Sequence, residues 1–251
     1  MRTRRASPDD RAPGRFRDRR EGGRLLASRL SAYRRRPRAV VLGLPRGGVV
    51  PAAVIARTLE LPLDVIISRK LHAPGNPELA IGAIAEGGEP YLNAESLDVT
   101  GASESHIARE LAEQRSEIAR RQQLFRGGAP LRLPERATAI LVDDGIATGS
   151  TVVAAIQALR RQAVERIVLA VPVAPPDTVE RLRTMVDEVA VLSTPILFWA
   201  VGAFYDDFRQ VSDAEVRKLL EEAASERTPP DEDGAKSPPP LSWYAECLST
   251  L

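Results

Sequence analysis

The sequence predicts an α/β fold built on an open, mainly parallel sheet with flanking helices. Three observations support this prediction: short continuous apolar runs, segments of helical periodicity, and the regular alternation of the two along the chain. A continuous apolar run with β-branched residues is typical of a strand that is buried on both faces. Strands that alternate with helices imply right-handed crossovers, which make neighbouring strands parallel.

Five apolar runs are the predicted strands of the sheet. They lie at residues 39–44, 63–68, 138–144, 166–173 and 188–194. Segments with helical periodicity predict helices at residues 49–60, 150–162 and about 176–184. The interval between the second and third long strands departs from this alternation. There, two short strands around a Gly-rich turn (78–88 and 90–93) and a long amphipathic helix (103–125) predict an irregular excursion.

Composition narrows the class of protein. The chain has 251 residues, which is enough for one large domain with appendages. Its 35 basic and 34 acidic side chains nearly cancel, so net charge does not point to nucleic acid or to a membrane. No apolar run reaches the roughly 18 residues of a membrane span, and no apolar segment follows the N-terminal arginines as in a secretory signal. The single cysteine, Cys247, has no internal partner for a disulfide. We expect a cytoplasmic protein.

The two ends of the chain differ from its middle. Residues 1–14 predict a disordered basic arm, and residues 1–38 hold fourteen arginines against four acids. Few aromatic residues interleave with these arginines to stack on bases, so a solvated arm followed by an amphipathic helix is favoured over nucleic-acid binding. Residues 225–251 carry five prolines and an acidic cluster, which predicts a disordered tail. Residues 15–224 are the predicted folded domain.

The segment from Ala139 to Thr151 carries the strongest chemical signal. A buried strand ends in two carboxylates, Asp143 and Asp144, passes through a loop rich in glycine and hydroxyl groups, and enters a helix. In open parallel sheets, ligands bind beyond the carboxyl ends of the strands, where this loop lies. Free N–H groups at the start of a helix suit a phosphate. The two acids would repel a phosphate, and they suit vicinal hydroxyls or Mg²⁺ instead.

Other interpretations of this loop fit less well. It lacks the lysine of a Walker A loop and the glycine spacing of a dinucleotide fingerprint. An ordinary strand–turn–helix unit with polar capping would explain Ser150 or Thr151. Capping alone does not require two adjacent acids and two glycines, so the segment favours a ligand site.

The sequence VDDGIATGST at residues 142–151 resembles the signature of type I phosphoribosyltransferases. The resemblance implies that Asp143 and Asp144 hold the ribose 2′- and 3′-hydroxyls of phosphoribosyl pyrophosphate (PRPP), and that they assist Mg²⁺ indirectly, through these hydroxyls or water. It implies a cradle for the 5′-phosphate made of Gly145, Ile146, Ala147, Thr148, Gly149, Ser150 and Thr151. The segments RKLHAPGNPELAIGAI and FWAVGAFYDDFRQVSDAEV also resemble an uncharacterised bacterial phosphoribosyltransferase-like group.

A second loop follows the first strand, at the same predicted edge of the sheet. Its Gly47-Gly48 turn exposes backbone N–H groups and Arg46 supplies a cation, a combination that fits a pyrophosphate. Taken alone, the loop is equally well explained as a simple turn with an exposed arginine. Beside the first motif it resembles the family's pyrophosphate loop, which is often strained or cis.

The resemblance also assigns roles to the excursion. Arg69 and Lys70 stand at the end of the second predicted strand, so they are expected at the ligand edge of the sheet. The resemblance makes Lys70 a catalytic candidate, beside Arg46, for neutralising pyrophosphate. Residues of about 71–127 stand where the family has a mobile lid, which excludes water from the reacting sugar. His72, Asn76 and Glu78 are weaker candidates, and His106 is expected on a helix surface.

The segment of about 195–215 corresponds to the family's small C-terminal hood over the acceptor. It holds the aromatic residues Phe198, Trp199, Phe204 and Tyr205. Stacking on a planar base and packing on the core explain them equally well. Ala147 stands where enzymes for 6-oxopurines often carry an acid, which disfavours guanine and hypoxanthine as acceptors.

The function implied by this resemblance is Mg²⁺-dependent transfer of phosphoribose between PRPP and a nitrogenous base or related acceptor, with release of pyrophosphate. The expected partners are PRPP and a small-molecule acceptor. Binding to a membrane or to nucleic acid is not expected, and the sequence does not decide whether the protein forms a homodimer. Two alternatives on the same fold are a non-catalytic regulator that binds PRPP or a nucleotide, and a PRPP hydrolase.

Overall fold

A computed structural model describes residues 15–226, and in this part of the chain a parallel sheet of five strands forms the centre. The strand order is β2-β1-β6-β7-β8, and every neighbouring pair is parallel. The strands are β1 (Ala39–Gly43), β2 (Leu63–Val65), β6 (Thr138–Val142), β7 (Arg166–Val173) and β8 (Glu188–Ser193). The predicted α/β fold with an open, mainly parallel sheet is confirmed.

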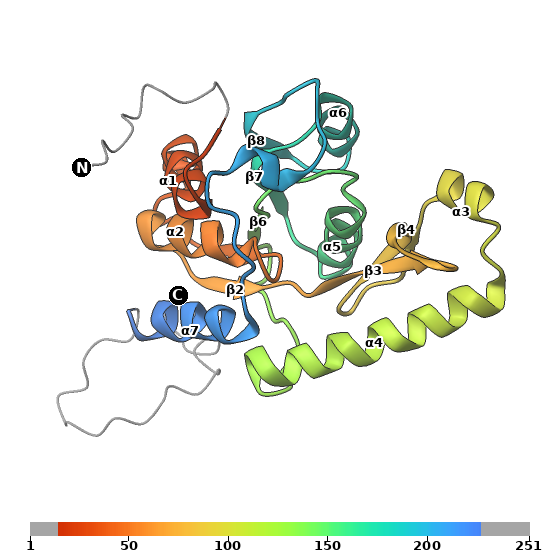
Figure 1. Cartoon of the computed structure of the whole chain (residues 1–251). Coiled ribbons are helices and arrows are strands. Elements are labelled where there is room, and N and C mark those ends of the chain that lie inside the picture. Colours follow the sequence, from red (N-terminus) through yellow and green to blue (C-terminus); the bar gives the residue numbers. More distant parts are fainter. Residues whose placement is uncertain (1–14, 227–251) are drawn as a thin grey trace, which may run out of the picture.

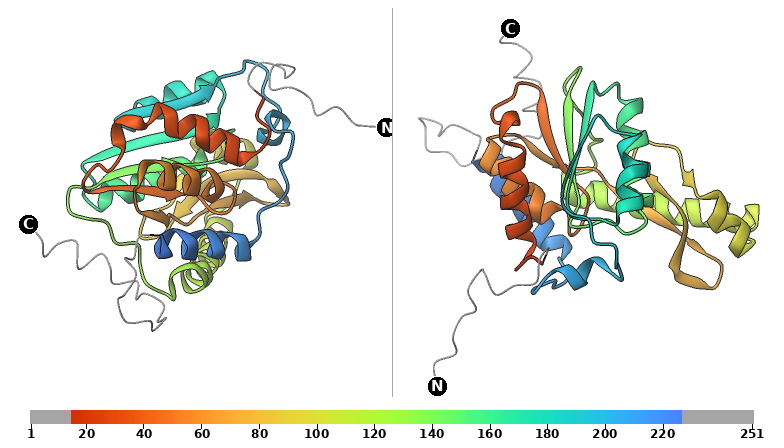
Figure 2. Two further views of the ribbon diagram at one scale, coloured as in Figure 1. Left: turned by 90° about the vertical axis from the view of Figure 1, so that its left-hand side faces the viewer. Right: turned by 90° about the horizontal axis from the view of Figure 1, so that it is seen from above.

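Helices cover both faces of this sheet (Figures 1 and 2). On one face, α1 (Arg19–Arg29) and α2 (Val49–Leu59) pack against strand residues such as Val41 and Val142. On the other face, α5 (Ser150–Arg161) and α6 (Pro176–Arg183) pack against Leu42 and Leu141. Side chains of a strand alternate between faces, so β1 and β6, which are buried along their whole length, contribute to both cores.

The excursion between β2 and β6 forms a second, antiparallel sheet and two helices that extend away from the main sheet (Figure 1). It contains β3 (Ser68–Ala73), β4 (Asn76–Ala85), β5 (Tyr91–Leu92), α3 (Ala94–Thr100) and α4 (Glu104–Arg126). The predicted long helix is therefore confirmed as α4. The predicted strand at 63–68 is wrong as a single unit, because it divides between β2 and β3. The chain leaves the parallel sheet at Ile67, whose N–H donates 2.8 Å to the buried Glu86 side chain instead of to a strand.

The described chain ends in two elements that the periodicity did not predict in detail. A 3₁₀ helix, η3 (Val201–Phe204), follows β8, and α7 (Asp213–Ser225) follows that; a further short 3₁₀ turn, η2 (Ser31–Tyr33), lies after α1. Ser212 and Glu215 form a reciprocal capping box that starts α7. Val216 and Leu219 of α7 then pack in the same apolar cluster as Ile118 and Phe125 of α4.

The start of the described segment lies beside the end of η3. The Phe16 N–H donates 2.8 Å to the Phe204 carbonyl, and the Asp206 N–H donates 2.8 Å back to the Phe16 carbonyl. The predicted basic arm, residues 1–14, and the predicted tail after Glu226 lie outside the described residues. Within residues 15–226, no helix has the length and apolar character needed to cross a bilayer.

Candidate active site

The two sequence motifs meet at one edge of the sheet because β1 and β6 are neighbours in register. Gly43 pairs with Val142, so the loop after β1 and the loop after β6 leave the sheet together. The contact is so close that a Cβ added to Gly47 would stand 1.9 Å from Asp144 Oδ2. Glycine at this position is what allows the first loop to touch the acid of the second.

The acid pair is held in a desolvated environment. Asp143 Oδ1 accepts the Asp144 N–H at 2.8 Å, and the Tyr205 hydroxyl donates to the Asp144 carbonyl. Burial raises the pKa of Asp143 well above its usual range, and the neighbouring charge of Asp144 raises it further. Burial also raises the pKa of Asp144, against the opposing effect of the Arg19 guanidinium. The pair therefore favours one negative charge rather than two.

Arg19, at the first position of α1, is a site residue that sequence reasoning missed. Its Nε donates 2.5 Å to Asp144 Oδ2, and its Nη1 donates 2.8 Å to the Arg209 carbonyl. The guanidinium carbon lies 3.8 Å from the centre of the Phe208 ring, in a cation–π contact. Arg19 thus supplies the counter-charge of the acid pair from a helix 125 positions earlier in the sequence.

The loop after the acids presents backbone N–H groups. The carbonyls of Ala147 and Thr148 accept hydrogen bonds from the side chains of Thr178 and Arg181 on α6. Gly149 adopts the left-handed conformation, at φ 75°, and caps α5 without a side-chain hydrogen bond. In the described part of the chain, the N–H groups from Ala147 to Thr151 have no hydrogen-bond partner. Together with the dipole of α5, they form a ready anion site.

The loop after β1, residues 44–48, has a comparable form, and we call it the pyrophosphate-type loop. The peptide bond between Pro45 and Arg46 is cis. The Gly48 N–H is used inside the turn, where it donates 3.0 Å to the Leu44 carbonyl. A Cβ at Gly48 would approach the Val142 carbonyl oxygen to 2.7 Å, so this glycine also permits close packing on β6.

A pocket of about 330 Å³ opens where these parts meet. Its lining comprises Arg19, Arg46, Gly47, Asp144, Phe208, Gln210 and Val211. Residues from the pyrophosphate-type loop, the acid pair and the predicted hood therefore share one cavity, in which two guanidinium groups face one carboxylate. This arrangement suits an anionic ligand that also carries hydroxyl groups.

Comparison with known proteins is consistent with this geometry. Residues 19–209 match the family model described as “Phosphoribosyl transferase domain”. This chain belongs to the phosphoribosyl transferase family. The predicted resemblance is confirmed at the level of the family and the fold.

Three relatives define how close the match is. Two curated proteins from strains of Mycobacterium tuberculosis, each named “Putative phosphoribosyl transferase”, are 43% identical to this chain over 227 residues. The match covers 90% of this chain and 51% of each relative, so the chain spans about half the length of these proteins. The crystal structure of TT1426 from Thermus thermophilus is 45% identical, with a TM-score of 0.67, over 83% of this chain and 98% of that one.

In this phosphoribosyl transferase domain, the two basic residues at the start of β3, Arg69 and Lys70, have different surroundings. Successive strand residues point to opposite faces, and Arg69 donates 2.9 Å to Gln114 of α4 while Lys70 is exposed. Neither Arg69 nor Lys70 lines the pocket that contains Arg46. The catalytic role of Lys70 stays a prediction.

The aromatic residues of the predicted hood differ in how deeply they are buried. Tyr205 is only 3% exposed and packs between Phe16 and Phe208, with ring centres 5.5 and 5.0 Å away. Phe198 and Phe204 stack on each other at 5.1 Å. Trp199 is 88% exposed. Phe208 faces the pocket, although the sequence did not single it out.

Two of the four weaker candidates of the excursion, His72 and His106, join the antiparallel sheet to α4. The His72 N–H donates 2.9 Å to Glu110, and His106 Nε2 lies 2.8 Å from the His72 carbonyl. Asn76 and Glu78 are exposed at the turn between β3 and β4. These contacts are structural, and none of the four residues lines the pocket of the acid pair.

Proposed function

We propose that this chain transfers phosphoribose between PRPP and a nitrogenous base or related acceptor and releases pyrophosphate, with Mg²⁺ as cofactor. The observation that supports this proposal is the contact between the loop of Arg46 and Gly47 and Asp144 of the acid pair, which share one pocket. The amide-rich start of α5 follows the acid pair directly along the chain. Each part matches one group of PRPP: the acid pair matches the ribose diol, the start of α5 the 5′-phosphate, and the loop the diphosphate.

In this assignment the start of α5 binds the 5′-phosphate through N–H groups that, among the described residues, have no other partner, aided by the helix dipole. Asp144 accepts hydrogen bonds from the ribose hydroxyls, and Asp143, with its raised pKa, shares a proton with it. Arg46 neutralises the diphosphate as the bond between C1′ and the pyrophosphate oxygen breaks.

The chemistry depends mainly on position and charge. Positive charge grows at C1′ while the acceptor nitrogen approaches, and the buried carboxylate stabilises that charge in a site of low dielectric. Water must be kept from the reacting sugar, and the segment 71–127, as the proposed lid, together with the aromatic hood, is suited to exclude it.

The acids fit a weakly held Mg²⁺. Within residues 15–226, no group of three His, Cys, Asp or Glu side chains is arranged to hold a metal by itself. Mg²⁺ commonly binds through one or two carboxylates together with water and substrate phosphates. Asp143 and Asp144 would therefore contact the ion through ribose hydroxyls or water. When bound, Mg²⁺ would neutralise charge on the departing pyrophosphate.

Two measurements test the proposal. Isothermal calorimetry with PRPP, with and without Mg²⁺, measures binding. A pyrophosphate-release assay against a panel of bases then measures transfer. Binding without release would favour the regulator, and release without any added base would favour the hydrolase. The absence of PRPP binding would contradict the proposal.

A further inference from the structure

Four arginines from three segments of the chain gather beside the pyrophosphate-type loop. Arg46 belongs to that loop, Arg69 to β3, and Arg120 and Arg121 to α4. Arg69 lies against the same helix as Arg120 and Arg121, because its Nε donates 2.9 Å to the Gln114 side chain of α4. Burial lowers the pKa of Arg69, and the charges of Arg121, Arg46 and Arg120 lower it further, against the opposing charge of Glu117. A cluster of this kind needs negative charge to be stable.

Glu117 supplies part of that charge within α4. Its Oε2 accepts from Arg120 Nε at 2.7 Å, and its Oε1 accepts from Arg121 Nε at 2.8 Å. These hydrogen bonds lower the pKa of Glu117 to about 2. Glu117 is therefore a fixed anion that orients both arginines.

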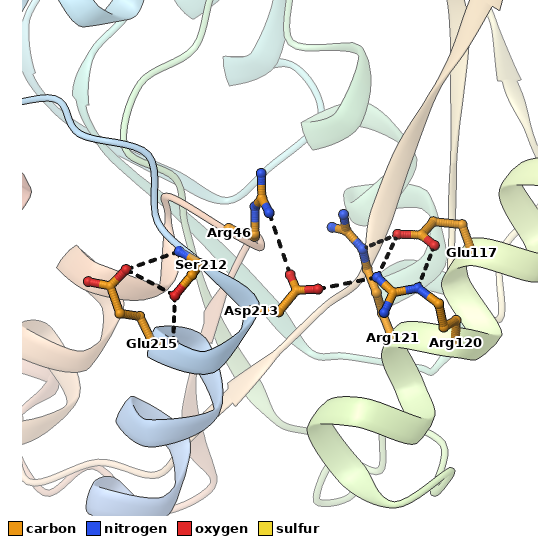
Figure 3. A network of polar contacts seen from close by, with 7 residues as sticks. All are labelled: Arg46, Glu117, Arg120, Arg121, Ser212, Asp213 and Glu215. Atoms are coloured by element: carbon orange, nitrogen blue, oxygen red, sulfur yellow. Dashed lines mark hydrogen bonds and ion pairs between the residues drawn. The ribbon is translucent and has the colours of Figure 1, made fainter.

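Asp213, at the first position of α7, is the second carboxylate of the cluster, and its contacts with the arginines are longer than those of Glu117. Its Oδ2 accepts from Arg120 Nη2 at 3.2 Å, while its Oδ1 lies 3.8 Å from Arg46 Nη1, beyond hydrogen-bond distance. Oδ1 is buried and, among residues 15–226, has no hydrogen-bond partner. Figure 3 shows this carboxylate between the Arg46 and Arg120 side chains.

The charges of the cluster therefore do not balance. Four guanidinium groups face two carboxylates, and one carboxylate oxygen makes only a loose ion pair. Phosphate groups bind well to planar guanidinium donors from several directions. A diphosphate held by Arg46 would place further oxygens within reach of the same surroundings.

We propose that Arg69, Arg120 and Arg121 extend the diphosphate site that begins at Arg46, and that Asp213 occupies this site in the free protein as a substitute for a phosphate oxygen. The inference rests on the proposed function, because the ligand is the diphosphate of PRPP or the pyrophosphate product. A bound diphosphate displaces Asp213 from Arg46 and Arg120. The excursion, through α4, is then joined to the pyrophosphate-type loop by the ligand.

The test uses the full chain and inorganic pyrophosphate as the probe, by isothermal calorimetry. Asp213→Asn removes the competing charge, and we expect its Kd for pyrophosphate to fall by about threefold or more at low salt. The gain is expected to shrink at high salt, because the side chains of Arg46, Arg120 and Asp213 are partly exposed and dissolved ions screen their charges. The matched control is Glu215→Gln, two residues later, which keeps the capping box and leaves the cluster intact.

A second pair of variants tests the cations. Arg120→Gln removes one partner of the diphosphate, and we expect its Kd for pyrophosphate to rise. Arg217→Gln is its control, because Arg217 lies on α7, pairs with Glu221 and does not belong to the cluster. If Asp213→Asn unfolds, Asp213→Ser provides the same measurement with a smaller polar side chain, and it leaves the Ser212 N-cap in place.

The outcomes separate the inference from the proposed function. An unchanged or higher Kd in the Asp213 variant overturns the inference. Binding of PRPP by the wild-type chain without any binding of pyrophosphate, in the chain or its variants, also overturns it and leaves the proposed function standing. If neither PRPP nor pyrophosphate binds, the proposed function is contradicted, and so is the inference that rests on it.

Discussion

The Arg19 guanidinium joins Asp144, from which it lies 2.5 Å, to Phe208, whose ring centre lies 3.8 Å away. Both members of the ion pair are largely buried, with side chains 10% and 13% exposed. Truncation of one partner in such a pair leaves an uncompensated charge in a poorly solvated place. This relationship makes the acid pair sensitive to a residue that lies 125 positions away in sequence.

Substitution Arg19→Gln should destabilise the fold in a pH-dependent way. Loss of one partner of a buried ion pair typically costs about 3–5 kcal/mol. Without Arg19 the pKa of Asp144 rises further, so the folded state retains a proton that the unfolded state loses, and stability falls as pH rises through that raised pKa. Urea denaturation at pH 5 and pH 8 measures this, with the loss expected to be larger at pH 8. Arg24→Gln, on the exposed face of α1, is the control. Equal losses at both pH values would contradict the account.

Substitution Asp144→Asn should strongly reduce PRPP-dependent turnover. Removal of one preorganised charged group commonly costs about 2–4 kcal/mol of transition-state stabilisation, which corresponds to a loss of about 30- to 1,000-fold in kcat/KM. The pyrophosphate-release assay measures it, with circular dichroism to establish that the fold is intact. Asp207→Asn is the control, because Asp207 pairs with Arg209 near the same pocket but lies outside the acid pair. Unchanged turnover in the Asp144 variant would count against the mechanism.

Substitution Gly47→Ala should weaken PRPP binding. The added Cβ would stand 1.9 Å from Asp144 Oδ2 and 3.2 Å from Arg19 Nε, so the loop must move away from the acid pair. We expect the Kd for PRPP to rise by about tenfold, since misplacement of positioning groups by about 1 Å is costly. Calorimetry measures the change. A variant that binds PRPP as tightly as the wild type would show that this contact opens during binding.

Substitution Asp64→Asn should flatten the pH dependence of stability. Burial raises the pKa of Asp64 from 3.8 to about 6, although Arg126 opposes the shift. Between these values the folded state binds the extra proton, so Asp64 lowers stability as pH rises from about 4 to 6, by about 2–3 kcal/mol in total. We expect the variant to lose this decline. Thermal unfolding from about pH 4 to pH 7.5 tests it, with the exposed Asp98→Asn as control. A parallel decline in the Asp64 variant would refute the assignment.

Much of the fold was predictable because its signals are local. Strands β1 and β6 are continuous apolar runs, and their loops carry glycines whose neighbours the parallel register fixes. The placement of Gly47 against Asp144 follows from that register. The start of α7 also had a local signal, the Ser212 and Glu215 pair, which forms a capping box.

What could not be predicted depends on contacts between distant residues. Arg19 is one of fourteen arginines in residues 1–38, and only its approach to Phe208 and Arg209 distinguishes it. The division of residues 63–68 between two sheets depends on Glu86, which accepts the Ile67 N–H from nineteen positions away. In both cases the residue that determines the local structure is far away in sequence, so a pattern in neighbouring residues does not reveal it.

The hydrogen bonds of Phe16 with Phe204 and Asp206 have a consequence for folding during synthesis on the ribosome. The acid pair at residues 143 and 144 is synthesised long before Phe208 and Arg209, the groups that hold Arg19 in place. A nascent chain that has completed β6 therefore still lacks the wall of its own pocket. The binding site is complete only after residues up to Arg209 have been synthesised and have packed against Arg19 of α1.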